Sequence, residues 1–199
     1  MNKDELQKYM EQSEDFFCIH GMRKENNIAS IMQNGFIIRE KQGPTLTEAK
    51  GGKVHINWER FKDGIKTTED RLENAVNFDY WYDYDSKNKG RIIFNIPRTI
   101  MEDIEECGLT NNGMRFFQTY IFDALQKDIP EIGIKVLPKE YIYAAINPDD
   151  SVTMNENYLT NLPPKEQARE MQRVQANIGR LAAERNALPP YEPPYERLY

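Results

Sequence analysis

The sequence has few of the residues that build metal centres and disulfide frameworks. It contains two cysteines, Cys18 and Cys107, and two histidines, His20 and His55. Two cysteines are too few for a disulfide framework, and two histidines argue against a multi-histidine zinc site. We therefore expect no bound metal. We also expect both cysteines to be reduced and buried, because each has apolar residues close by in the sequence.

Long apolar runs and an excess of basic charge are also missing. No stretch approaches the ~18 apolar residues of a membrane-spanning helix, and residues 1–6 lack the apolar run of a signal peptide. The formal net charge is −6, whereas nucleic-acid binding requires a basic face. These features predict a soluble protein with no membrane partner, for which nucleic acid is a disfavoured partner. It would be cytoplasmic, or an effector delivered without a cleaved signal peptide.

The hydrophobic pattern predicts an α+β fold. Short apolar segments bounded by turn residues are typical of strands, and apolar residues three or four apart are typical of helices. We expect strands at residues 16–19, 36–38, 54–58, 92–97, 132–136 and 141–146. We expect helices at residues 4–15, 26–33, 67–78, 100–107, 114–125 and 165–185. The order shows no regular β-α-β alternation, so the helices are expected to be inserted among the strands.

The character of the chain changes near residue 161. Residues 1–161 are expected to form a single domain, followed by a C-terminal helix and a Pro-rich tail with a repeated Pro-Pro-Tyr unit in residues 162–199. Adjacent prolines favour an extended segment, so the tail is expected to bind a partner and to add little to the core. The alternative is that the helix packs on the sheet through one apolar stripe, formed by Met171, Val174, Ile178 and Leu181.

Three positions are candidates for chemistry. His20 opens the segment 20–23 at a predicted strand end, His55 lies within a predicted strand, and Glu140 precedes an apolar strand. Taken singly, each has an ordinary structural explanation: a surface histidine before a turn glycine, a packed strand histidine and a solvated glutamate. The argument for a function therefore rests on their combination.

The segments around these residues share a pattern. The first strand ends in His-Gly, the following helix carries two spaced isoleucines and ends at Gly-Phe, and a later strand opens with Glu-Tyr-Ile-Tyr. Over roughly residues 16–147 this pattern resembles the ADP-ribosyltransferase fold, in its diphtheria-toxin and poly-ADP-ribose-polymerase branch. That branch is marked by a histidine, a tyrosine and a glutamate. His55 stands where the tyrosine is expected, as in the RNA 2′-phosphotransferase branch. Pro138, two residues before Glu140, argues against the arginine-modifying branch.

The resemblance implies a fold of split antiparallel β-sheets with inserted helices, and NAD as the substrate. Glu140 would accept a hydrogen bond from a ribose hydroxyl and stabilise the oxocarbenium-like charge that develops when nicotinamide leaves. His20 would hold the adenosine ribose, and backbone groups of Gly21 would hold the nicotinamide amide. His55 would stack on the nicotinamide ring, and Arg23 would contact the pyrophosphate.

The function implied by the resemblance is NAD-dependent ADP-ribosyl transfer. A protein is the favoured acceptor because the chain is acidic. Two other enzyme functions are open, an NAD glycohydrolase and an RNA 2′-phosphotransferase-like enzyme. A third alternative is a catalytically inactive binding module of the same fold, in which the Pro-Pro-Tyr tail is the binding segment.

Overall fold

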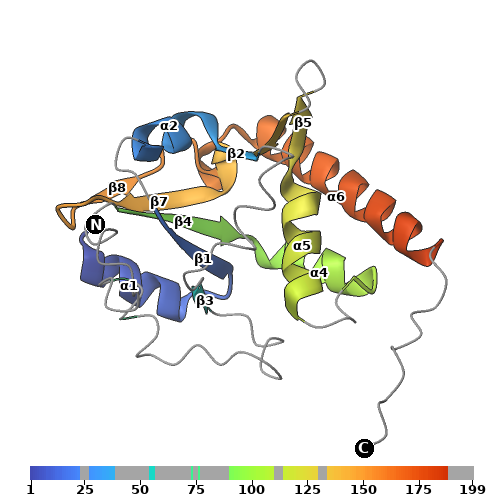
Figure 1. Cartoon of the computed structure of the whole chain (residues 1–199), viewed down its shortest axis with the longest axis horizontal. Helices are drawn as coiled ribbons and strands as arrows, with labels where there is room; N and C mark the ends of the chain where they lie inside the picture. The colour runs from blue at the N-terminus through green and yellow to red at the C-terminus, as the bar shows by residue number, and fades with distance from the viewer. Residues whose placement is uncertain are drawn as a thin grey trace, which may run out of the picture.

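The chain combines helices with two antiparallel sheets, so the predicted α+β class is confirmed (Figure 1). The computed structural model describes residues 1–22, 27–38, 54–56, 73, 76, 90–109, 114–129 and 134–187. Arg23, the Pro-Pro-Tyr tail and nearly all of the predicted helix at residues 67–78 lie outside the described residues.

The larger sheet has five strands in the order β3-β1-β4-β7-β8, and all neighbours in it are antiparallel. Strands β4 and β7 are buried along their whole length. Most of their residues are apolar, as expected for strands covered on both faces, and Arg91 and Asn95 of β4 are buried polar exceptions. The strands are β1 (Phe16–Gly21), β3 (Val54–Ile56), β4 (Arg91–Ile96), β7 (Ile142–Ile146) and β8 (Val152–Met154).

The smaller sheet has three antiparallel strands in the order β2-β6-β5. They are β2 (Phe36–Ile38), β5 (Lys127–Ile129) and β6 (Ile134–Leu137). A short 3₁₀ turn, η4 (Lys139–Tyr141), leads from β6 of the small sheet into β7 of the large one. This turn carries Glu140, so the candidate glutamate lies at the junction of the two sheets.

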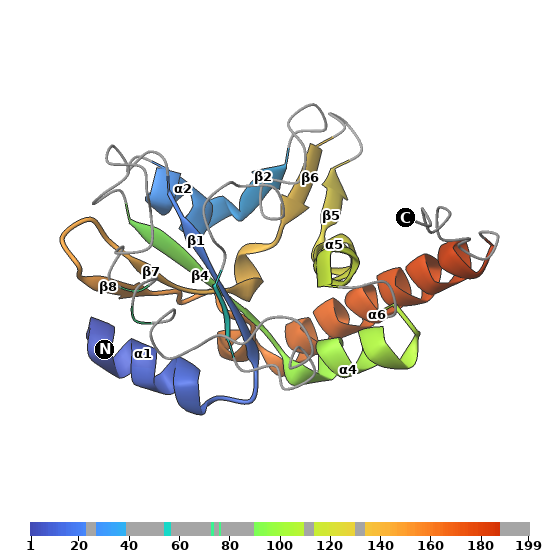
Figure 2. The ribbon, with the colours of Figure 1, turned by 60° about the horizontal axis from the view of Figure 1, so that its bottom comes forward.

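The two faces of the large sheet are covered by different elements. Helix α1 (Lys3–Gln12) packs on one face through Leu6 and Met10. Helix α2 (Asn27–Asn34) and the small sheet lie on the other face (Figure 2). The other helices are α4 (Arg98–Glu106), α5 (Met114–Leu125) and α6 (Pro164–Asn186).

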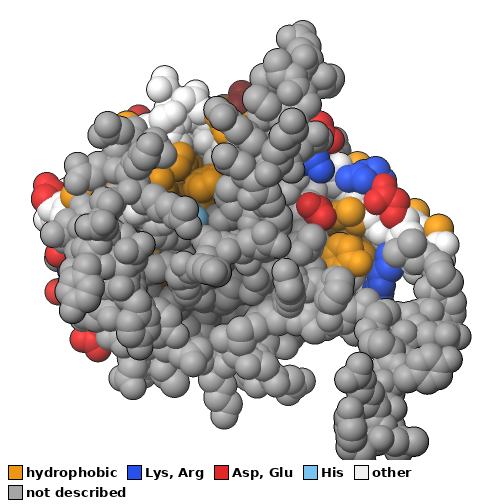
Figure 3. All heavy atoms as spheres, viewed as in Figure 1, with side chains coloured by type: hydrophobic (Ala, Val, Ile, Leu, Met, Phe, Trp, Pro, Cys, Tyr) orange, Lys and Arg blue, Asp and Glu red, His pale blue; other side chains and the backbone are white. Residues whose placement is uncertain are grey.

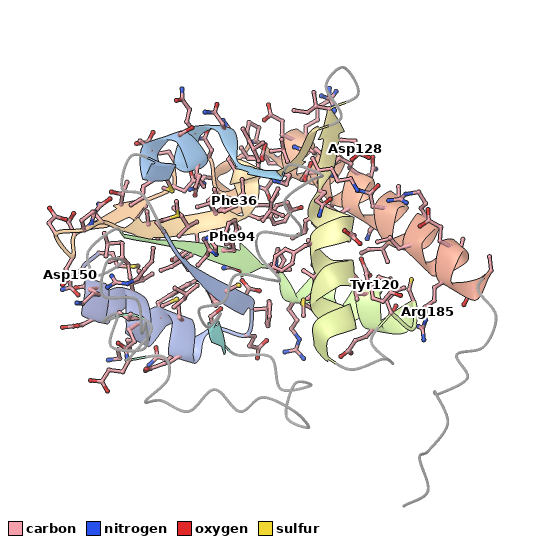
Figure 4. The ribbon with its side chains drawn as sticks, in the orientation of Figure 1. Phe36, Phe94, Tyr120, Asp128, Asp150 and Arg185 are labelled. Atoms are coloured by element: carbon pink, nitrogen blue, oxygen red, sulfur yellow. The ribbon has the colours of Figure 1, made fainter. Side chains whose placement is uncertain are left out.

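Alternation along β1 divides its side chains between the two faces. Phe17 and Ile19 pack toward α1, whereas Phe16 and Cys18 belong to the larger core on the side of the small sheet. Phe36 of β2 lies over this face, with its ring centroid 6.2 Å from that of Phe94 in β4 (Figure 4). Aromatic contact across the gap therefore joins the small sheet to the large one.

Helix α6 is part of the core. Val174, Ile178 and Leu181 are buried in the same cluster as the residues of α4 and α5. The prediction that residues after 161 add little to the core is therefore wrong for the helix. The alternative is confirmed in that the helix docks through its apolar stripe, with Met171 only partly buried, but α6 packs mainly on α4 and α5 and not across the sheet.

Two strands, β5 and β8, were not predicted, and the exposure of Cys107 differs from the prediction. Strands β5 and β8 were not predicted because each has three residues at a sheet edge, where short and polar segments are common. Cys18 is buried as predicted, but Cys107 is exposed because it ends α4 as its C-cap residue. Among the described residues, no helix has the length and apolar character needed to cross a membrane.

Candidate active site

His20 lies near the end of β1 on the face covered by the small sheet. Its ring meets the ring of Phe36 edge to face, with centroids 5.1 Å apart and planes at 89°. The side chain is partly exposed. Figure 3 shows a small pale blue area, the colour of histidine, beside hydrophobic side chains. His20 is therefore fixed by packing on one side and open on another, as a ligand-binding residue would be.

His55 lies on the strand next to His20. In the register between β1 and β3, it stands opposite Cys18. Residues directly opposite each other occupy the same face of a sheet, as do residues two apart on one strand. Positions 20 and 55 therefore share a face as diagonal neighbours, about 7–8 Å apart. The side chain of His55 lies outside what the structure describes.

Gly21 ends β1 and pairs with Arg91 of β4. The amide of the next residue, Met22, donates to the carbonyl of Gly90 at 3.0 Å. On the other side, the described register between β1 and β3 runs only as far as the pair of Ile19 with Val54. A ligand amide held by the backbone of Gly21 would bind at the edge that faces away from β4.

Glu140 is held in a turn that side-chain hydrogen bonds fix. The buried amide of Asn155 donates to the carbonyls of Lys139 and Ile142, both at 2.7 Å. These two bonds enclose Glu140 on both sides in the chain. Its side chain is 19% exposed, and its carboxylate lies 3.6 Å from the ammonium of Lys127 in β5. The glutamate is therefore partly buried, reachable by solvent and paired with one cation.

The register separates Glu140 from His20. His20 pairs with Ile92, which pairs with Ala145 further along β7, whereas Glu140 precedes the start of β7. Ala145 lies three residues into β7, about 10 Å from the start of the strand, and Glu140 lies two residues before that start; β7 is two strands from β1, about 10 Å across the sheet. They are thus not in contact, and would have to bind different parts of one ligand.

Two further charged residues, Glu170 and Arg173, are linked to Glu140 through Lys127. The ammonium of Lys127 also lies 3.4 Å from the carboxylate of Glu170 in α6. Glu170 is buried, and Arg173 donates to it from Nε at 2.9 Å and from Nη2 at 2.5 Å. Burial alone would raise the pKa of Glu170. The hydrogen bonds and charge of Arg173, with the charge of Lys127, outweigh it and hold this pKa below its usual value.

Arg173 is itself fixed by the end of α5. Its Nη1 donates to the carbonyl of Gln126 at 2.8 Å and its Nη2 to that of Leu125 at 2.7 Å. The last carbonyls of a helix have no partner within the helix, so these bonds satisfy groups that would otherwise need water. Next to Glu140, burial raises the pKa of the Tyr141 hydroxyl above its ordinary value, and the charge of Glu170 adds to the shift.

A polar pocket of about 510 Å³ lies between β5, β6 and α6, and Lys127 and Arg173 are in its wall. Figure 3 shows basic and acidic side chains intermixed where β5 and α6 lie. Glu140 is not among the lining residues, so the pocket is linked to the candidate carboxylate only through Lys127. Its other lining residues are Asp123, Gln126, Asp128, Lys135, Asn177, Arg180, Leu181 and Glu184.

Sequence reasoning missed Lys127, Asn155, Glu170 and Arg173. One signal was present for Glu170, because it stands four residues before Val174 and so continues the apolar stripe of α6 toward its N-terminus. A carboxylate in a buried stripe needs a partner, and Arg173 lies one turn away. Lys127 and Asn155 carried no such signal, because their partners are distant in sequence.

Within the described residues, no group of three or more histidine, cysteine, aspartate or glutamate side chains is placed to hold a metal ion. Comparisons of the chain with known protein families, with curated proteins and with solved structures gave no match.

Proposed function

We propose that this protein is an NAD-dependent ADP-ribosyltransferase that breaks the bond between nicotinamide and ribose and transfers ADP-ribose to a protein acceptor. The observation that carries the proposal is the meeting of the candidate segments in one sheet. The His-Gly end of β1, the strand holding His55 and the turn holding Glu140 are far apart in sequence, yet their strands belong to the same five-stranded sheet.

The separation between His20 and Glu140 suits a dinucleotide. NAD has two riboses joined through a pyrophosphate, so one residue can hold the adenosine ribose while another serves the nicotinamide ribose. In this assignment His20 holds the first and Glu140 the second. Gly21 would hold the nicotinamide amide through its backbone, and His55 would lie against the nicotinamide ring. Arg23, proposed for the pyrophosphate, lies outside the described residues.

Glu140 has the central role in the reaction. When the bond between the ribose C1′ and the nicotinamide nitrogen breaks, the electron pair leaves with nicotinamide and positive charge develops on the ribose. A carboxylate beside this centre stabilises the charge as it forms. The acceptor nucleophile then bonds to C1′ and loses its proton. A partly buried carboxylate at a fixed turn is suited to this role, because it need not reorganise during the step.

The test is release of nicotinamide from NAD by wild type and by Glu140→Gln, which keeps the shape and removes the charge. We expect kcat to fall by about 10²-fold or more, with little change in KM. Glu106→Gln, at an exposed position of α4, is the matched control and should retain wild-type activity. Wild-type kcat in Glu140→Gln would overturn the assignment of Glu140, and no release by wild type would overturn the function.

The acceptor is a separate question that mass measurement answers. If ADP-ribose appears on an added protein, transfer is supported. If free ADP-ribose is the product whatever acceptor is added, the enzyme is an NAD glycohydrolase, and transfer is rejected. Either product requires that nicotinamide has been released, so either one rejects the inactive binding module.

A further inference from the structure

The carboxylate of Glu140 is the end of a chain of four alternating charges that crosses from the sheet junction to α5. Lys127 Nζ lies 3.6 Å from Glu140 Oε1 and 3.4 Å from Glu170 Oε2, and Arg173 donates twice to Glu170. Arg173 in turn donates to carbonyls at the end of α5. Each member is held by the next, so the chain begins on a fixed helix end and finishes at the candidate glutamate.

The two inner members of this series of charges, Glu170 and Arg173, are held rigidly by their surroundings. Glu170 is 7% exposed, and its two oxygens are both engaged by Arg173. Charge-assisted bonds of this paired kind fix geometry as well as adding energy. Glu170 is thus an immobile anchor for the ammonium of Lys127. The outer part is more open, since Lys127 is 37% exposed and stands on an edge strand.

We propose that Lys127 is a positioning residue for Glu140. Its ammonium, anchored by Glu170, holds the carboxylate of Glu140 in one orientation toward the nicotinamide ribose. The inference rests on the proposed function. A cation beside the developing ribosyl charge would by itself oppose the reaction. Glu170 stands at a similar distance from the same ammonium, and with Arg173 included the four charges sum to zero, so Lys127 orients the carboxylate without adding a net positive charge to the group.

The expected effect follows from orientation. Misplacing a reacting group by about 1 Å can cost up to about 10²-fold in rate, so loosening Glu140 should lower kcat by roughly 10-fold or more. KM for NAD should stay within about 2-fold, because the same contact is not needed to bind the dinucleotide. Arginine keeps the charge and the hydrogen-bond donors, so Lys127→Arg should recover most of the loss.

The experiment measures nicotinamide release, kcat and KM for Lys127→Met, Lys127→Arg and the double variant Lys127→Met with Glu140→Gln. Lys3→Met is the control, because Lys3 of helix α1 is likewise a lysine in an ion pair, with Asp150 at 3.1 Å, but has no part in the proposed site. Far-UV circular dichroism checks that each variant is folded. Single-turnover assays at high enzyme concentration measure the slow variants.

Support requires a lower kcat in Lys127→Met, unchanged KM, recovery in Lys127→Arg and wild-type kcat in Lys3→Met. It also requires no further loss in the double variant relative to Glu140→Gln, a readout that a merely structural role would not give. Wild-type kcat in a folded Lys127→Met, or an additive loss in the double variant, overturns the inference. If Lys127→Met does not fold, Lys127→Gln decides by the same criteria. An inactive wild type overturns both the proposed function and this inference. An active wild type with an equally active Lys127→Met overturns the inference alone.

Discussion

Gly35, just past the end of α2, packs directly on the backbone of Leu137 at the end of β6. A β-carbon added at Gly35 would overlap the carbonyl oxygen of Leu137 and would lie 3.0 Å from the amide nitrogen of Lys139. The φ angle of Gly35 is +81°, in the left-handed region that favours glycine. This close approach fixes the end of α2, the helix that follows the His-Gly segment, against the turn that carries Glu140.

Replacing this glycine tests that contact. Gly35→Ala should lower the free energy of unfolding by about 1–3 kcal/mol, because it adds a backbone clash to an unfavourable φ. Gly179→Ala is the control: a β-carbon there would meet nothing within 4 Å, and alanine should stabilise α6 by about 0.5–1 kcal/mol. Urea denaturation measures both, and a Gly35→Ala variant as stable as wild type would contradict the close packing.

Acid should weaken the fold through Glu170. Its pKa lies below the ordinary value of 4.5, so the folded state favours the carboxylate form. The stability this adds is complete above about pH 5 and is lost as the pH falls through the lowered pKa of the folded state. Unfolding free energies measured from pH 7 down to pH 3 should therefore fall more steeply for wild type than for Glu170→Gln.

Other acidic side chains with shifted pKa values do not affect the comparison of wild type with Glu170→Gln. A hydrogen bond from Ser151 lowers the pKa of Asp149, and burial raises the pKa of Asp123, but both groups are present in the two proteins. Their contributions cancel when one curve is subtracted from the other, provided they do not couple to Glu170. Parallel curves for wild type and variant would show that the pairing with Arg173 and Lys127 does not favour the carboxylate.

Two truncations test the role of α6. A chain ending after Asn161 loses the buried side chains of Val174, Ile178 and Leu181 and leaves the end of α5 without Arg173. It should lack a cooperative thermal transition. A chain ending after Asn186 keeps all of these contacts and should melt like the full chain and retain nicotinamide release. A folded shorter chain would show that the helix is dispensable, and an inactive longer chain would show that the last residues are structural.

Local patterns in the sequence were enough to predict the elements that are buried or strongly periodic. β1, β4 and β7 each contain an unbroken apolar run, at residues 16–19, 92–94 and 142–146, so the burial of these runs could be predicted without knowing their neighbours. The predicted range of α5 matches the observed one, because apolar residues recur along it and a strand signal is missing. Edge strands β5 and β8 have neither property, since three residues at an edge owe their conformation to a partner strand.

The sequence by itself determined which segments are apolar, where the His-Gly turn and the Glu-Tyr strand stand, and which face of the last helix can be buried. Glu170 continues that face in the sequence, although it was not predicted as part of the site. Only the tertiary structure decided that Glu140 meets Lys127, that Lys127 shares Glu170, and that His20 packs on Phe36. Propensity and periodicity act over a few neighbouring residues, whereas these pairs join side chains from separate elements. Their meeting depends on how two sheets and α6 pack together, which no short stretch of the chain encodes.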